Sequence, residues 1–328
     1  MTLPSSPSAG DIVGLNDYAR TFGTNNLTVA RNSSNIQGEA TDATFSVSGQ
    51  STMFVYVDAT KGWVPTEDQT TTNYGFTPIV ATGGTITCCG DYKIHTFTSP
   101  GTFCVSDAGS VGKVDYLVVA GGGGGASDGA GAGGAGGYRE SKCSSISGCW
   151  TASPLATCAS LTVTATAFPI TVGGGGAGHP GPAGSPGTQG SDSTFSTITS
   201  TGGGAGGRPT AGSGGSGGGP RADVSGSTGA GNTPPVSPPQ GNPGGTNPSP
   251  GTGSAGGGGA GAAGTGGTSP QAGPGGNGVT SEINASPVTR AGGGGGGNDQ
   301  TDAFGTGGSG GGGNGGRSCA EDAQAGTD

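Results

Sequence analysis

The sequence has few of the side chains from which most proteins build a core or attract a charged partner. Hydrophobic residues make up 29% of its 328 residues, aromatic residues 5% and charged residues 9%, whereas soluble domains usually have about 45–50% apolar and about 25% charged residues. The eleven Lys and Arg residues are scattered, and the net charge is −9. Because no basic stripe is present to meet a phosphate backbone, we expect no nucleic-acid partner.

Targeting and membrane-spanning segments are also missing. No apolar run approaches the roughly 18 residues of a membrane-spanning helix, and residues 1–10 lack the charged and apolar stretches of a signal peptide. If Met1 is the start of the chain, we expect a protein that is not exported by a cleaved signal.

The seven cysteines lack the spacing of a zinc site, in which paired ligands are usually separated by about two to four residues. We therefore expect no metal and no cofactor. An odd number of cysteines leaves at least one thiol outside any internal disulfide. The pairing stays open: Cys88 or Cys89 with Cys104, and Cys143 with Cys149 or Cys158.

Catalytic motifs occur only as by-products of the glycine content. Where about one residue in three is glycine, the G-x-G-x-x-G pattern of a dinucleotide site arises by chance, and no long helical pattern follows these tracts. Ser216 and Ser309 fit G-x-S-x-G, but that hydrolase motif expects a downstream histidine. Both histidines, His95 and His179, precede these serines. We therefore expect that the chain is not an enzyme.

Glycine is the most abundant residue and is concentrated in one region. Residues 121–328 hold 68 of the 81 glycines, against a usual share of about 7%. Ordering each residue costs on the order of 1–2 kcal/mol, which so few side chains cannot offset by burial. Neighbouring polyproline II helices that hydrogen-bond through their backbones are the favoured solution. Residues 178–190 repeat glycine every third residue, which leaves a short collagen triple helix as the less favoured alternative.

The predicted fold is therefore all-β, with a polyglycine II (polyproline II helix) sandwich. The predicted domains are an N-terminal β domain for trimerisation or attachment (1–64), a linker (65–85), a β layer (86–120) and a glycine-rich tip (121–328). Strands are expected in β-branched and aromatic runs, at residues 11–15, 27–31, 43–48, 53–57, 92–98, 102–105 and 114–120. Residues 114–120, 168–172, 195–201 and 288–291 each run directly into glycine, which predicts a β layer from which glycine helices project.

Two sets of large side chains are candidate functional residues. A scaffold poor in side chains can display a few groups at its loop tips, where binding residues usually lie. The candidates for receptor binding are His179, Arg208, Arg221, Asn298, Asp299 and Phe304. The N-terminal domain is small and has few apolar residues, so we expect oligomerisation to complete its core. The candidates for packing inside a trimer are Phe22, Phe45, Phe54 and Trp63.

Several segments resemble proteins of tailed bacteriophages. Residues 9–13, 24–29, 35–38 and 56–63 resemble a small β domain that recurs in phage tail fibres. The Tyr-Leu-Val-Val-Ala-Gly segment at 116–121 and the Asn-Thr-Pro-Pro-Val-Ser-Pro-Pro-Gln-Gly segment at 232–241 resemble glycine-rich fibre tips of marine phages. Such tips often close with a β-branched strand, whereas residues 317–322 here are polar.

The resemblance implies a homotrimeric tail fibre or receptor-binding protein of a phage particle. It would be assembled in the host cytoplasm, with other tail or virion proteins as partners. Its receptor would be a bacterial surface glycan or an outer-membrane protein. The alternatives are a decoration fibre of the head or baseplate, and an extracellular glycine-rich structural or ice-binding protein.

Overall fold

The computed structural model describes residues 1–66, 78–90, 92–127, 131–143, 150–179, 185–207, 210–222, 227–247, 251–299, 303–316 and 323–327. In these residues the chain forms strands, turns and irregular segments but no helix, which confirms the all-β class. Accordingly, none of them forms a helix able to cross a membrane. The chain divides into two compact units, Met1–Ala81 with Val105–Gly112, and Thr82–Cys104 with Lys113–Asp328.

The first unit contains two small antiparallel sheets, one with strand order β1-β4-β5 and the other pairing β2 with β3. Its strands are β1 (Ile12–Asn16), β2 (Leu27–Val29), β3 (Ala43–Phe45), β4 (Ser51–Asp58) and β5 (Gly62–Pro65). The first four lie where the sequence predicts strands. The fifth, β5, begins at Gly62, whose φ of +68° and whose Cβ position, 1.8 Å from the Asn35 carbonyl oxygen, permit only glycine.

The core of the first unit corrects the prediction that its aromatic residues pack inside a trimer. Phe45, Phe54 and Trp63 are each 0% exposed within the single chain, so they have no surface to offer a neighbouring subunit. Phe22 is partly buried against the same core. The prediction counted too few apolar residues, because Leu3 and Ile36, which lie outside the strands, complete the cluster.

A buried carboxylate, Asp17, ties together two loops of the first unit. Its side chain accepts hydrogen bonds from the backbone N–H groups of Thr21, Phe22 and Gly49, each at 2.9 Å. Burial alone would raise the pKa of Asp17, but these backbone donors outweigh it, and the pKa lies below its ordinary value of 3.8.

Acid is therefore expected to weaken the first unit through Asp17. The pKa of Asp17 is lower in the folded protein than in the unfolded chain, so its ionised form stabilises the fold. This stabilisation is complete at pH values above the unfolded pKa and is lost as the pH falls through the folded-state pKa. The melting temperature of the wild-type unit should fall as the pH drops below about 4. The Asp17→Asn variant should melt lower at pH 7 and change less with pH, whereas a change at exposed Glu39, Glu39→Gln, should leave the wild-type profile intact. If the melting temperatures of Asp17→Asn and the wild type changed with pH in parallel, Asp17 would not be the source of the acid sensitivity.

The remaining strands form short sheets, of which the largest has the order β17-β16-β15-β9-β6. Their bounds are β6 (Val80–Thr82), β7 (Thr85–Cys89), β8 (Tyr92–Thr96), β9 (Gly101–Asp107), β10 (Lys113–Val114), β11 (Leu117–Val119), β12 (Tyr138–Ser141), β13 (Ala156–Thr157), β14 (Leu161–Thr162), β15 (Ala167–Thr171), β16 (Ser193–Phe195), β17 (Ile198–Ser200), β18 (Val279–Ser281) and β19 (Val288–Arg290). Strand β6 lies inside the segment predicted as a linker, of which residues 67–77 fall outside the described residues.

Three aromatic rings pack together on neighbouring strands of the largest sheet. They belong to Phe103 on β9, Phe168 on β15 and Phe195 on β16, and their centroids are 5.8–6.4 Å apart.

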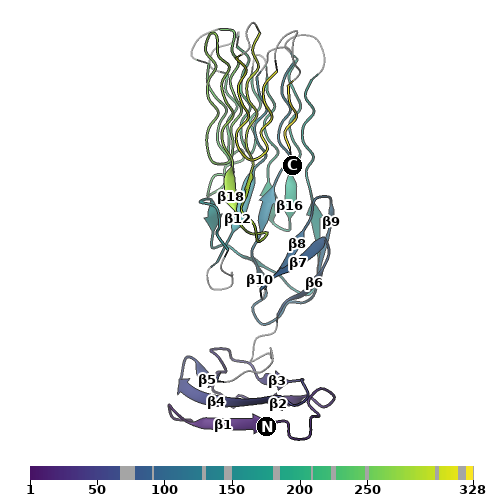
Figure 1. Cartoon of the computed structure of the whole chain (residues 1–328), viewed down its shortest axis with the longest axis vertical. Coiled ribbons are helices and arrows are strands. Elements are labelled where there is room, and N and C mark those ends of the chain that lie inside the picture. Colours follow the sequence, from purple (N-terminus) through teal and green to yellow (C-terminus); the bar gives the residue numbers. More distant parts are fainter. Residues whose placement is uncertain are drawn as a thin grey trace. The chain divides into compact units, whose positions relative to one another are not determined.

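Four of these strands run directly into glycine-rich segments, as the sequence predicts. A single residue separates each of the strands β11, β15, β17 and β19 from the glycine run that follows it, which begins at Gly121, Gly173, Gly202 and Gly292, respectively. In the second unit, the glycine-rich segments extend side by side away from the strands (Figure 1). We call the described residues of 120–137, 172–278 and 291–327, apart from their strands, the glycine array.

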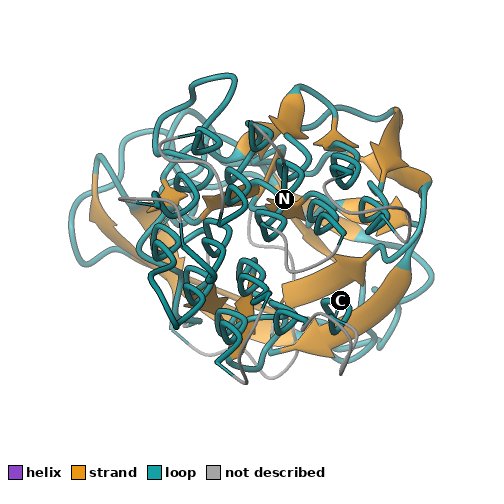
Figure 2. Cartoon of the chain, turned by 90° about the horizontal axis from the view of Figure 1, so that it is seen from above, coloured by secondary structure: helices purple, strands orange, loops and turns teal. Residues whose placement is uncertain are grey.

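Backbone hydrogen bonds join the segments of the glycine array with a period of three residues. Gly121, Gly124 and Ser127 donate to Ser191, Thr188 and Ser185 on one neighbour, at 2.9–3.1 Å. From the same segment, Gly123 and Ala126 donate to Gly134 and Gly131 on a second neighbour. Successive residues therefore point to different neighbours, and each segment appears as a narrow coil when seen end-on (Figure 2).

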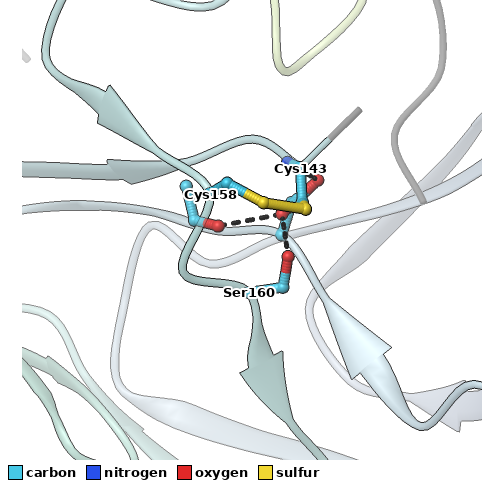
Figure 3. Close-up of a disulfide and its surroundings, with 5 residues drawn as sticks. Cys143, Cys158 and Ser160 are labelled. Atoms are coloured by element: carbon cyan, nitrogen blue, oxygen red, sulfur yellow. Dashed lines mark hydrogen bonds between the residues drawn. A yellow bond between two sulfur atoms is a disulfide. The ribbon is translucent and has the colours of Figure 1, made fainter. Parts of the chain in front are cut away.

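A disulfide and a carboxylate join the residues that follow β12 and β13. Cys143 is bonded to Cys158, one of the pairings that the spacing leaves open, while Cys88, Cys89 and Cys104 are free. Beside the disulfide, Asp115 accepts hydrogen bonds from the hydroxyls of Ser141 and Ser160 (Figure 3). The two cysteines are 15 residues apart in the sequence. A disulfide that closes a loop of this length stabilises a fold by about 3 kcal/mol.

Candidate functional site

Polar residues gather at the end of the glycine array that lies farthest from the strands. Backbone hydrogen bonds join neighbouring segments there: Arg221 donates to Gly207 at 3.1 Å, and Gly251 donates to Ala222 at 2.8 Å. The amide of Asp299 donates to Thr252 at 3.1 Å. These bonds fix residues from distant parts of the sequence next to one another. We call residues 207, 221–222, 251–252 and 298–299 the distal end of the array.

Two candidate residues form an ion pair at the distal end. Nη2 of Arg221 lies 3.3 Å from Oδ2 of Asp299, although the residues are 78 positions apart. Their side chains are only 11% and 26% exposed. The structure therefore brings together two groups that the sequence treated as separate, and each limits the rotamers of the other. A charge-assisted hydrogen bond of this kind is stronger than a neutral one.

Asn298 is completely buried and has a structural role. Its side-chain amide donates to the carbonyl of Pro270 and to that of Ala303, the latter at 3.3 Å. The sequence missed a second amide of this type, Asn247, whose Nδ2 donates to the carbonyl of Arg221 and whose Oδ1 accepts from the amide of Gly267, both at 2.9 Å. Its only signal is an isolated amide side chain within a glycine-rich stretch, as at Asn298.

The other candidates differ in their exposure. His179 is exposed, and its backbone N–H donates to Gly125 at 3.2 Å. Phe304 is half-buried. Arg208 lies outside the described residues. His179 and Phe304 are thus the predicted groups whose side chains retain exposed surface.

A second polar cluster lies among the strands. Glu140 is buried and accepts hydrogen bonds from the hydroxyls of Tyr138 and Ser281 and from the amide of Ser153, at 2.6–3.1 Å. Burial raises the pKa of Tyr138 well above its ordinary value. A small hollow next to this cluster is lined in part by Tyr116, Arg139 and Pro238. Because the three donors come from different elements, Glu140 cross-links β12, the residues before β13, and β18.

Among the residues that the structure describes, no group of three or more His, Cys, Asp or Glu side chains is placed to hold a metal ion. A family model described as a glycine-rich domain matches residues 98–328. No curated protein matches the sequence. The match covers the glycine array and most of the strands of the second unit.

Proposed function

The chain belongs to this glycine-rich domain family, and from the resemblance of its sequence to phage fibres we propose that it is the receptor-binding tail fibre protein of a tailed bacteriophage and not an enzyme. It would form a homotrimer in the virion, after assembly in the host cytoplasm, and attach to other tail proteins through its N-terminal β domain. Its receptor would be a glycan or an outer-membrane protein of the bacterial surface.

The period-three hydrogen bonds support a polyglycine II sandwich as the framework. A polyproline II helix has three residues per turn and no internal hydrogen bonds, so each turn directs its backbone groups to several neighbours. The first segment of the array shows this pattern. It donates backbone hydrogen bonds to one neighbour from Gly121, Gly124 and Ser127, and to another neighbour from Gly123 and Ala126. Such a framework is stabilised through its backbone and leaves its loop residues available for recognition.

The observation that carries the proposal is the set of polar groups fixed at the distal end. Arg221 and Asp299 form a pair, and the backbones on both sides of it are hydrogen-bonded to residues 251–255. Two further candidates keep exposed surface: His179 is exposed and Phe304 is half-buried. Paired cationic and anionic groups donate and accept hydrogen bonds, as sugar hydroxyls require. Aromatic and Arg residues dominate binding hot spots, so a surface glycan is the receptor class we favour.

Adsorption measurements test this proposal. The fluorescently labelled full chain is expected to bind at least one strain in a panel of Gram-negative bacteria, and purified lipopolysaccharide from that strain should compete. The double variant His179→Ala, Phe304→Ala should bind at least about tenfold less, since each hot-spot residue contributes about 1–2 kcal/mol or more. Its melting temperature should stay near that of the wild type.

A matched control is Gln189→Ala, which removes an exposed side chain from the side of the array. This variant should bind like the wild type. Equal binding by the double variant and the wild type would place the receptor contacts elsewhere. Antibodies against the chain should label tail fibres on intact particles; labelling of the head would favour the decoration fibre instead.

A further inference from the structure

The disulfide between Cys143 and Cys158 closes the segment that connects β12 to β13. These two strands pair in parallel, and their last pair is Ser141 with Thr157. One further backbone hydrogen bond, from the amide of Lys142 to the carbonyl of Thr157 at 2.8 Å, extends the pairing up to the cysteines. The backbone therefore brings the two cysteines next to each other through bonds in which sulfur takes no part.

Asp115 holds the two ends of this segment together from a third stretch of chain. Its carboxylate accepts hydrogen bonds from the hydroxyls of Ser141 and Ser160, at 2.9 and 2.7 Å, and from the amide of Cys143 at 3.3 Å (Figure 3). Ser141 and Cys143 belong to the beginning of the segment, whereas Ser160 follows Cys158 at its end. One carboxylate thus bridges both ends, again without a bond to sulfur.

The segment itself is only weakly buried. In the part that the structure describes, residues 150–157, only Ser153 is buried. The amide of Ser153 donates to the Glu140 carboxylate at 3.1 Å, and the amide of Thr151 donates to that of Glu282 at 2.9 Å. Segments with little burial are the first to open locally. The covalent bond at the ends of this segment is therefore expected to control how often it opens.

We propose that the disulfide is a redox-controlled lock. The second unit folds with both thiols reduced, because Asp115 and the strand pairing already align them, and oxidation then fastens the segment of residues 143–158 next to Glu140. The change of setting rests on the proposed function, in which the chain assembles in the host cytoplasm. Thiols stay reduced there and form disulfides outside the cell.

The exposure of the two cysteines indicates the order of the exchange steps. Cys158 is exposed and Cys143 is half-buried, so a small-molecule oxidant such as glutathione disulfide meets Cys158 first. The Cys158 thiolate attacks one sulfur of the oxidant, forms a mixed disulfide and releases one glutathione thiolate. The Cys143 thiolate then attacks the Cys158 sulfur and releases the second glutathione thiolate. Two electrons and two protons pass from the protein thiols to glutathione disulfide, which becomes two glutathione molecules.

Hydrogen exchange of the purified full chain tests the lock, with one sample oxidised by glutathione disulfide and another kept reduced by a phosphine. Peptides that contain Thr151 and Ser153 should exchange at least about tenfold faster in the reduced sample, since a disulfide across a loop of this length shifts the opening equilibrium by about 100-fold. Peptides from residues 131–137 of the glycine array should exchange equally in both. The double variant Cys143→Ser, Cys158→Ser should match the reduced wild type in either solution.

Asp115→Asn tests the alignment of the thiols. The amide that replaces the carboxylate has a single acceptor oxygen and no charge, and hydrogen bonds to a charged group are the stronger ones. Oxidation of the reduced chain by glutathione disulfide, followed by alkylation and mass spectrometry, should be at least about tenfold slower in this variant. Asp107→Asn, which changes an exposed carboxylate at the end of β9, should oxidise at the wild-type rate.

Four results would overturn the lock: a reduced second unit that exchanges throughout like an unfolded chain, equal exchange of the segment in both redox states, oxidised chains in which Cys149 replaces Cys143 or Cys158 in the bond, or wild-type oxidation of Asp115→Asn. These measurements use no bacteria, so they fail separately from the proposed function. A chain that binds cells but shows any of these results lacks only the lock. A chain that locks as expected but binds no strain of the panel lacks only the receptor-binding function.

Discussion

Gly133→Ala is expected to destabilise the second unit by about 3 kcal/mol, the upper end of the usual range for overpacking a close-packed interior. A Cβ at this position would lie 1.9 Å from the carbonyl oxygen of Gly123, far inside van der Waals contact. The segment cannot move away, because Gly294 donates to the carbonyl of Gly133 and Gly134 donates to Gly204 on another side. Calorimetry should show a melting temperature lower by roughly 6–12 °C for a unit of this size.

Gly174→Ala is the matched control, because the same substitution there meets nothing within 4 Å. Gly174 is exposed at the edge of the array. The variant should melt at the wild-type temperature or slightly above it, since alanine restricts the unfolded chain and adds about 0.4–1 kcal/mol. If the two variants melt alike, close backbone packing does not hold the array together.

Phe54→Ala is expected to cost the first unit about 3–5 kcal/mol, the usual range for removing a fully buried phenylalanine. Its ring is 0% exposed and lies 6.1 Å from the ring of Phe45 in an edge-to-face arrangement. Because the side chain packs within its own chain, the oligomeric state measured by sedimentation should not change. Thermal unfolding followed by near-ultraviolet circular dichroism would report the loss.

Tyr18→Ala provides the comparison for this core, since Tyr18 is 95% exposed. Its unfolding should match that of the wild type. A Phe54→Ala chain that melts normally but sediments as a smaller species would instead place this ring between subunits.

The sequence carries enough information to predict the fold class but not the details of the core. Strands β1, β4, β15 and β19 were predictable because β-branched and aromatic runs are local signals. The burial of Phe45, Phe54 and Trp63 was not, because it depends on Leu3 and Ile36, which lie far from them in the sequence or outside any strand. Composition alone therefore underestimated how well this unit closes its own core.

The candidate site was predictable as a set of residue types but not as an arrangement. Large polar groups stand out among glycines, which singled out Arg221, Asp299 and Asn298. Which of them pair, and which are buried, depends on how distant segments align: the Arg221–Asp299 contact spans 78 residues, and Asn298 is enclosed by carbonyls of other loops. A period of three in the sequence does not fix which segments become neighbours.

The scarcity of side chains inside the glycine array also determines how its stability responds to temperature. Exposed apolar surface raises the heat capacity of unfolding by about 0.45 cal/K/mol per Å², whereas exposed polar surface lowers it by about 0.26. Unfolding the array exposes mainly backbone amides, since segments such as 121–126 and 292–297 consist of glycine with few alanines. Its heat-capacity change per residue is therefore expected to lie well below the usual range of about 12–15 cal/mol/K. The curve of unfolding free energy against temperature is then flat, and cooling, which weakens hydrophobic cores, leaves the array nearly as stable as before.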